Sequence, residues 1–268
     1  MSVTILQKKY LNKAGLDDAS NIFLFISIFL GVWQLVYLLQ IWPDFLFPSP
    51  LTTFTKLAKI TIDGTLGYGI ANTLLRLIGG FFLAIVIGVG MGIAMLKFKG
   101  FGKTMSSFSV GLQSFPSIAW VPFSILLIGF NDYGILFVVI MSSTFSMMMS
   151  TYSGLRNVPL IYVEAARNMG TNGFQLFRHV MIPASMPSLI TGIRQAWSFA
   201  WHALVGAEML MTTIGLGAIL MYGREFQRMD QIIATMIVIF SIGLLADRFL
   251  FFKLEEKIRS KWGLNRND

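Results

Sequence analysis

Residues 74–96 read LLRLIGGFFLAIVIGVGMGIAML, an apolar run whose one charged side chain is Arg76. About 20 such residues in a helix are enough to cross the roughly 30 Å hydrocarbon core of a bilayer. The whole chain is also apolar, because 55% of its 268 residues are hydrophobic and only 13% are charged. Soluble domains carry roughly 25% charged residues. We therefore expect an all-α membrane protein.

Five further windows have the length and composition of a membrane span, which predicts six spans in total. Pro116 and Pro122 are expected to interrupt the third span of the chain, since proline lacks a backbone donor and clashes with the preceding helical turn. No small-residue cleavage site follows the first span, so it is expected to stay uncleaved. The five windows are 21–41, 107–130, 133–152, 188–211 and 231–251.

The connection between the first two spans contains prolines at positions 43, 48 and 50, which exclude a continuous helix there. The segment 51–62 that follows has the apolar periodicity of a short amphipathic helix at the membrane interface. Its expected apolar face is formed by Leu51, Phe54, Leu57 and Ala58.

Basic residues predict the orientation of the chain. Of the 21 Lys and Arg residues, 16 fall in the two tails and in the connections expected on the same side. Cytoplasmic segments carry an excess of Lys and Arg, so both termini are expected in the cytoplasm. Residues 1–65 then hold the N-terminal tail, the first span and the amphipathic helix. Residues 66–252 form a core domain with five spans, and residues 253–268 form a cytoplasmic tail.

The longest polar stretch between spans, residues 156–187, lies on the expected cytoplasmic side. A reversal between two helices takes only a few residues, so this length predicts a structured element. Pro159 suits the first turn of a short helix, and Gly170 suits its end in the left-handed conformation. The stretch is therefore expected to form two short helices hinged at a glycine.

The second short helix is expected over 172–180, with Thr171 as its cap and Pro183 as its stop. Exposed aromatic side chains next to basic ones are typical of a surface that docks another protein. The side chains expected on this surface are Phe174, Phe177, Val180, Arg178 and His179.

The composition excludes several kinds of chemistry. The chain has no cysteine and only two histidines, so neither a thiolate metal site nor the polar cluster of a membrane enzyme is expected. The sequence GFGKT at 100–104 is similar to the end of a phosphate-binding loop, but Lys97 stands where that loop requires a glycine. We expect no catalytic residue, no metal, no cofactor and no ATP hydrolysis in this chain.

The segments Glu164-Ala-Ala166, Gly170 and Val180-Met-Ile-Pro183 resemble the EAA signature of binding-protein-dependent ABC importer permeases. In that family the signature reads EAA, three residues, Gly, nine residues and I-x-L-P. Shorter patterns are similar to those of the nitrate, sulfonate, taurine and bicarbonate branch. They are FPSP at 47–50, NTLLR at 72–76, FPSIAWVP at 115–122, AEM at 207–209 and GREF at 223–226.

The resemblance implies a type I ABC importer permease fold with six transmembrane helices and a cytoplasmic coupling helix. It also implies two copies of a cytoplasmic ATPase that binds ATP and Mg²⁺, an external or periplasmic solute-binding protein, and an inner-membrane homodimer. The solute is expected to be a small anion. The residues expected to couple to the ATPase are Glu164, Ala165, Ala166, Gly170, Phe174, Phe177, Arg178 and Pro183.

Ionisable residues inside membrane spans usually face a partner or a water path. Arg76 and Glu208 are expected to pair in a structural or gating role, because a carboxylate would repel an anionic solute. Trp197 and Trp201 share a helix face and either line the path or simply pack. The broken third span adds Gln113, Ser114 and Ser117 as candidate path residues.

Two alternatives stay open. An ion-gradient-driven secondary transporter would place polar coupling residues at mid-membrane in broken helices. The same permease role could also serve a cyclic nutrient precursor instead of an anion.

Overall fold

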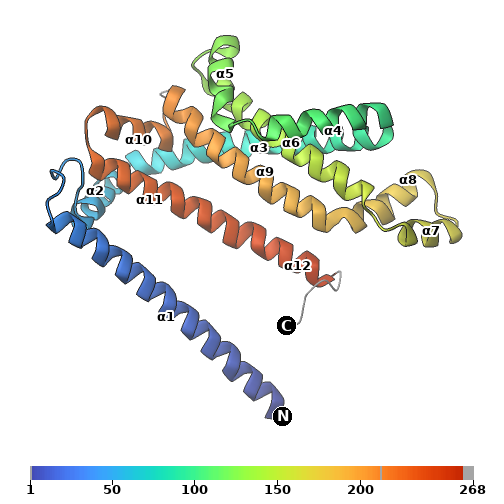
Figure 1. Ribbon diagram of the computed structural model, residues 1–268, viewed down its shortest axis with the longest axis horizontal. Coiled ribbons are helices and arrows are strands. Elements are labelled where there is room, and N and C mark those ends of the chain that lie inside the picture. The colour runs from blue at the N-terminus through green and yellow to red at the C-terminus, as the bar shows by residue number, and fades with distance from the viewer. Residues whose placement is uncertain (1, 212, 262–268) are drawn as a thin grey trace.

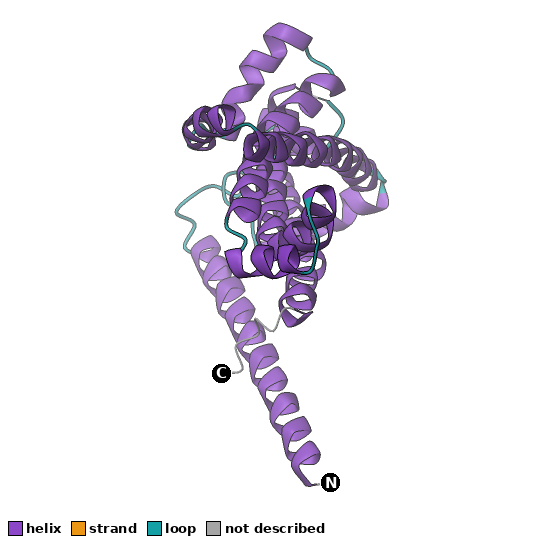
Figure 2. Ribbon diagram, turned by 90° about the vertical axis from the view of Figure 1, so that its right-hand side faces the viewer, coloured by secondary structure: helices purple, strands orange, loops and turns teal. Residues whose placement is uncertain are grey.

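The computed structural model describes residues 2–211 and 213–261, and every regular element within them is helical (Figures 1 and 2). The elements of the first half are α1 (Ser2–Leu38), α2 (Pro50–Ile62), α3 (Thr65–Lys97), α4 (Lys99–Gln113), η1 (Ser117–Ala119), α5 (Trp120–Ile128) and α6 (Asp132–Arg156). Those of the second half are α7 (Leu160–Asn168), α8 (Gly173–Leu176), η2 (Phe177–Met181), α9 (Ile182–Met211), α10 (Leu216–Glu225), α11 (Met229–Ala246), η3 (Asp247–Phe252) and α12 (Lys253–Lys261).

Among residues 2–211 and 213–261, four helices are long and apolar enough to cross a membrane, and six spans result if each of two bent helix pairs counts as one. The four are Ser20–Leu38, Thr65–Lys97, Asp132–Arg156 and Met229–Ile258. The bent pairs are Lys99–Gln113 with Ser117–Ile128, at 98°, and Gly173–Met211 with Leu216–Glu225, at 46°. These segments correspond to the six windows predicted from the sequence.

The third predicted span differs from expectation in shape. It turns through 98° between α4 and α5, so it is not a single straight crossing. The break falls at Pro116, as expected, whereas the predicted interruption at Pro122 is wrong. Pro122 lies in the first turn of α5, where a backbone N–H has no partner within the helix and proline is tolerated.

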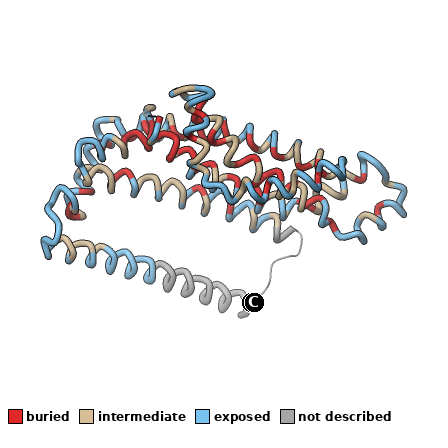
Figure 3. The backbone as a smooth tube through the Cα atoms, turned by 45° about the horizontal axis from the view of Figure 1, so that its top comes forward, coloured by how far each residue is buried: buried red, intermediate tan, exposed pale blue. Residues whose placement is uncertain are grey.

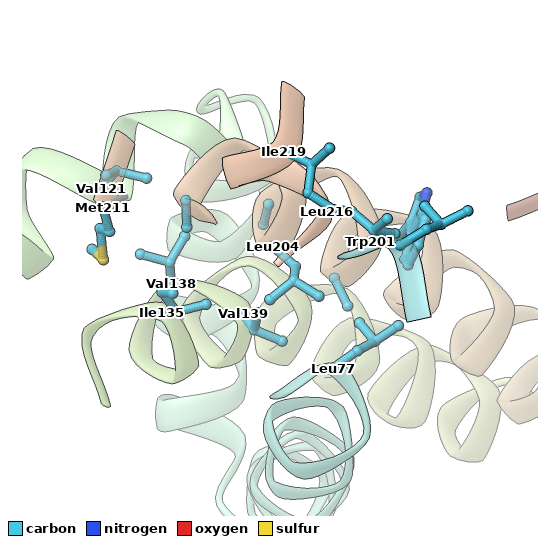
Figure 4. Close-up of a cluster of buried hydrophobic side chains, with 14 of the residues drawn as sticks. Leu77, Val121, Ile135, Val138, Val139, Trp201, Leu204, Met211, Leu216 and Ile219 are labelled. Carbon is cyan, nitrogen blue, oxygen red and sulfur yellow. The ribbon is translucent and has the colours of Figure 1, made fainter. Parts of the chain in front are cut away.

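The core of the bundle consists of α3, α6 and α9, which pack along most of their length. Glycines on α3 let α6 approach closely: an added Cβ would lie 2.8 Å from the Cβ of Met147 at Gly88, and 2.6 Å from the Cβ of Thr151 at Gly92. Small residues let helices approach closely in a bilayer. This packing stabilises the pair because lipid is as apolar as the side chains and supplies no hydrophobic driving force of its own. Figure 4 shows the buried cluster that these helices share with α10.

The first helix leans away from this core (Figures 2 and 3). It packs on α2, and the indole Nε1 of Trp33 donates a hydrogen bond to the carbonyl oxygen of Pro48 at 3.0 Å. Its apolar residues from 20 to 38 are mostly exposed, for example Phe23 and Phe25. A helix that is apolar all round and unburied is suited to contact lipid.

The amphipathic helix α2 forms where it was predicted, with Ser49 as its N-cap and Pro50 in its first turn. The expected apolar face is only partly right. The buried side chains are Thr53 and Ile60, whereas Leu51 and Phe54 are exposed. The helix therefore turns the face that carries Thr53 and Ile60 to α3 and α11, and leaves Leu51 and Phe54 free to contact the membrane interface.

Candidate functional site

The connection 156–187 projects from one end of the bundle as α7 and α8 (Figure 1). Gly170 has φ +86°, the left-handed conformation expected of it. Two hydrogen bonds close the helix end, from the Thr171 amide to the Ala166 carbonyl and from the Gly170 amide to the Arg167 carbonyl, each 2.9 Å. This pair of bonds is the Schellman motif, which fixes the direction in which the chain leaves the helix.

The second half of the connection differs from the prediction in two ways. The N-cap of α8 is Asn172 and not Thr171. Pro183 does not stop the helix, because α8 continues through the π turn η2 into α9. In that turn the Ile182 amide bonds to the Phe177 carbonyl, five residues back. The wider turn accommodates the proline ring, which would clash with the preceding turn of a regular α-helix.

The projecting loop exposes several large apolar side chains. Met169 and Phe174 are 78% and 73% exposed, on either side of the Gly170 hinge. Three residues at the start of α7 also belong to this apolar loop surface, which consists of Leu160, Ile161, Tyr162, Met169 and Phe174. An exposed apolar patch on a polar loop indicates a site for another protein.

The residues predicted to couple to a partner surround this surface. Glu164, Ala165 and Arg178 are exposed, Phe177 and Pro183 are half-buried, and Ala166 is buried beneath the hinge. The sequence prediction missed Leu160, Ile161 and Met169. The sequence did contain a signal for them. These three large apolar residues lie at the two ends of a nine-residue helix within an otherwise polar connection.

A second feature is an open hollow of about 910 Å³ between α9 and α11. Trp197 and Trp201 both line it, as their spacing of four residues allows. Trp201 is only 6% exposed, and its Nε1 would lie 3.3 Å from a Cβ at Gly243. Further lining residues include Gln195, Ser198, His202, Met209, Met236 and Phe240. The hollow is therefore mostly apolar with a few polar groups.

The other candidate path residues lie elsewhere. Gln113 and Ser117 line a cavity of about 10 Å³ against Phe199, and Ser114 is exposed. The Gln113 side-chain amide donates to the Phe145 carbonyl at 3.5 Å. These three residues thus lie outside the hollow that Trp197 and Trp201 line.

At the end of the bundle opposite the projecting loop, Arg76 and Glu208 form the expected ion pair, with Nη1 and Oε1 2.8 Å apart. Glu208 is fully buried and also accepts hydrogen bonds from the Thr73 hydroxyl at 2.9 Å and the Gly217 amide at 3.0 Å. Arg76 binds Asp132 as well, at 2.8 Å. A buried carboxylate needs this many donors to be tolerated in an apolar core.

Arg194 and Asp247, which line the hollow away from α10, belong to a second group of charges that the sequence did not predict to pair. Arg194 of α9 binds Asp247 of η3 through two bonds of 2.7 Å, and Glu255 of α12 at 3.1 Å. The bidentate geometry is the strongest that an arginine and a carboxylate adopt. These bonds attach the C-terminal helix to α9.

A bundle of membrane-length helices with an open hollow and a projecting apolar loop is the architecture expected of a membrane permease subunit. Residues 84–254 match the family described as "Binding-protein-dependent transport system inner membrane component". The chain belongs to this family of ABC importer permeases, whose members work with an ATPase and a substrate-binding protein.

Known relatives agree with this assignment. A Methanocaldococcus jannaschii protein named as an ABC transporter permease is 37% identical over 201 residues, covering 73% of this chain and 75% of that protein. The aliphatic sulfonates transport permease of Escherichia coli is 29% identical over 87% of this chain and 88% of its own length. The nitrate import permease of a Synechocystis strain is 27% identical over 85% of each chain.

The fold itself matches a solved structure. A chain of the MetNI methionine ABC transporter, in a structure described as inward facing, superposes with a TM-score of 0.62 at 18% identity. The match covers 72% of this chain and 96% of that chain. At this level of identity the match establishes the type I permease fold.

Proposed function

We propose that this chain forms the translocation path of an ABC importer and couples to a separate ATPase through the loop 156–187. The observation that carries the proposal is the apolar loop surface of α7 and α8, exposed at one end of a membrane-spanning bundle. Large apolar side chains contribute most to the binding free energy of an interface when the partner protein buries them. The left-handed conformation of Gly170 sets the direction of α8 relative to α7, as a docking element requires.

Each coupling residue has a distinct part in this proposal. Phe174 and the exposed end of α7 enter a groove of the ATPase, and the half-buried Phe177 follows three residues further along the chain. Glu164 and Arg178 supply charges at the rim, where they select the partner more than they add affinity. Ala165 and Ala166 keep α7 narrow beneath the hinge, and Pro183 joins the docking element to α9 through the π turn.

The working assembly in this proposal is a homodimer with the path near its two-fold axis. Two ATPase copies bind the two loops and provide the ATP and Mg²⁺, and this chain carries no ATPase site of its own. The two termini and the loop then lie in the cytoplasm, as the excess of Lys and Arg on that side favours. The solute-binding protein delivers its cargo at the opposite side.

The proposed solute is a small anion, supported by the sulfonate and nitrate permeases among the relatives. A cyclic nutrient precursor is the second candidate. Among the described residues, the open hollow of about 910 Å³ beside Trp197 and Trp201 offers space for a solute. Gln113 and Ser117 would contribute from the other side of α9.

The proposal is tested by purifying the chain with its ATPase and binding protein and measuring ATP-dependent uptake into proteoliposomes. Nitrate, taurine, an alkanesulfonate and bicarbonate are offered in turn, and an uncharged pyrimidine represents the second candidate class. Uptake that needs ATP and the binding protein supports an importer. Uptake driven by an ion gradient without ATP would establish the secondary transporter instead.

A further inference from the structure

The segment that follows α9 bridges three helices at the outer end of the bundle. This outer strap, residues 213–225, consists of a turn and the helix α10. Through Ile219 it packs against Gly69 of α3, and through Gly223 it packs against Ile232 of α11. The Gln231 side chain of α11 donates a hydrogen bond to the Ile219 carbonyl at 3.0 Å. In Figure 4, Leu216 and Ile219 of the strap lie within the buried cluster.

The outer strap also closes one end of the hollow between α9 and α11. Leu220 of α10 lines the hollow together with Val205, Gly206 and Met209 of α9. These residues occupy the last turns of α9, directly before the strap begins. Movement of α10 away from α3 would therefore open the hollow at this end.

Buried polar groups hold the turn of the strap in place. The Thr73 hydroxyl donates to Glu208 and accepts from the Leu216 amide, at 2.9 Å in each case. The Glu208 carboxylate accepts from the Gly217 amide, and the Arg76 Nη1 donates to the Ile214 carbonyl at 2.7 Å. Three side chains of α3 and α9 thus bind three backbone groups of the strap.

The fit around the carboxylate leaves no spare room. A Cβ at Gly215 would overlap the carboxylate of Glu208, and a Cβ at Gly217 would lie 2.6 Å from the Cβ of Glu208. Thr73 and Glu208 are both fully buried, and Arg76 is 9% exposed. In such surroundings each polar group costs free energy unless it keeps its partner. The arrangement therefore favours one position of the strap.

We propose that Thr73, Arg76 and Glu208 are positioning residues that hold the outer strap across the hollow and close it to the external side. This inference rests on the proposed function for the identity of the hollow as the path and for its orientation. In this proposal the Arg76–Glu208 pair does more than stabilise the bundle. It also binds the backbone of residues 214–217 and fixes their position.

The test uses the natural absence of cysteine in the chain. Val205→Cys places a reporter in the hollow, and an impermeant maleimide is added to the external side of cells. Thr73→Val, Glu208→Gln and Gly215→Ala are expected to raise the labelling rate at least tenfold. The control Gly67→Ala, at the same end of α3 with open space around it, should leave the reporter protected. A reporter that stays protected in all three variants overturns the proposal.

A second arm separates positioning from general support of the fold. The pair Gly69→Cys and Ile219→Cys links α3 to α10 without altering Thr73, Arg76 or Glu208, since the Cβ position at Gly69 lies against Ile219. In the Glu208→Gln background, oxidation of this pair should restore protection of position 205, and reduction should remove it. The label at position 205 is read by peptide mapping, because the reduced cysteines at 69 and 219 also react with the maleimide. Labelling that persists after oxidation overturns the positioning role. Both arms measure maleimide labelling and need neither the ATPase nor a solute. A negative result in the uptake experiment therefore does not affect them.

Discussion

The backbone amide of Thr171 donates a hydrogen bond to the carbonyl oxygen of Ala166 at 2.9 Å, and this bond exists because Gly170 between them adopts φ +86°. A residue with a Cβ pays roughly 1–2 kcal/mol in this conformation. Gly170→Val should therefore redirect α8 while leaving insertion near normal. We expect loss of ATPase co-purification and of uptake.

Gly170→Asn provides the matched control, because asparagine enters the left-handed region more readily than valine. It should retain most of the ATPase binding and uptake. Equal loss in both variants would show that the side chain, and not the backbone conformation, is what matters at this position.

The apolar loop surface gives a second prediction. Met169→Ser and Phe174→Ser remove two side chains that are more than 70% exposed, so the fold should lose little. Truncation of a central interface residue typically costs about 2 kcal/mol or more of binding free energy. We expect the affinity for the ATPase to fall at least tenfold for the double variant. Phe82→Ala, an exposed apolar residue within the α3 span, should bind the ATPase normally.

The packing of α3 on α6 gives a third prediction. Gly92→Leu should destabilise the bundle, because an added Cβ would lie 2.6 Å from the Thr151 Cβ and 2.8 Å from the Met148 carbonyl. Overpacking of this kind costs about 1–3 kcal/mol. Gly90→Leu is the control on the same helix, with nothing within 4 Å. The thermal midpoint of the purified protein should fall for the first variant only, and equal midpoints would contradict the observed contact.

Arg194 gives a fourth prediction. Its removal leaves Asp247 and Glu255 without the cation that joins α9 to α12. Both side chains of the Arg194–Asp247 pair are partly exposed, so the pair contributes only about 1 kcal/mol after solvent screening. Trypsin should then cleave after Lys253 and Lys257 several-fold faster in Arg194→Ala. Arg156→Ala, which removes an exposed arginine that binds Tyr152, should leave that rate unchanged.

Topology is tested with single cysteines. Tyr133, 75% exposed at the start of α6, should label from outside when replaced by cysteine. Tyr133 is a better probe than the neighbouring Asn131, whose side chain caps α6 by accepting from the Gly134 amide. Asn172→Cys, at the exposed end of the loop, should label only after the membrane is opened. The reverse pattern would invert the proposed orientation.

Much of the fold followed from local sequence. Apolar length predicted the spans, and the demand for a partner in an apolar core predicted that Arg76 and Glu208 would meet. Gly170 was predictable because few other residues tolerate its conformation. Each of these features depends on residue type or on neighbouring positions in the sequence.

Other features depend on contacts between distant segments or on how a helix continues. Nothing near Arg194 indicates that its partner is Asp247, 53 positions away. The π turn before Pro183 depends on how α9 continues, so a rule for regular helices predicted a stop that does not occur. The burial of Thr73 on Glu208 likewise depends on the packing of α3 against α9, and short sequence patterns do not specify it.

The continuity of α8, η2 and α9 joins the projecting loop to the opposite end of the bundle through one helical segment, which meets α6 where Gly192 faces Ser150. At a rise of 1.5 Å per residue, Phe174 and Glu208 each lie about 25 Å along the helix from that contact. A change in the direction of the segment at Phe174 therefore reaches the end that carries Glu208 without passing through a flexible connection.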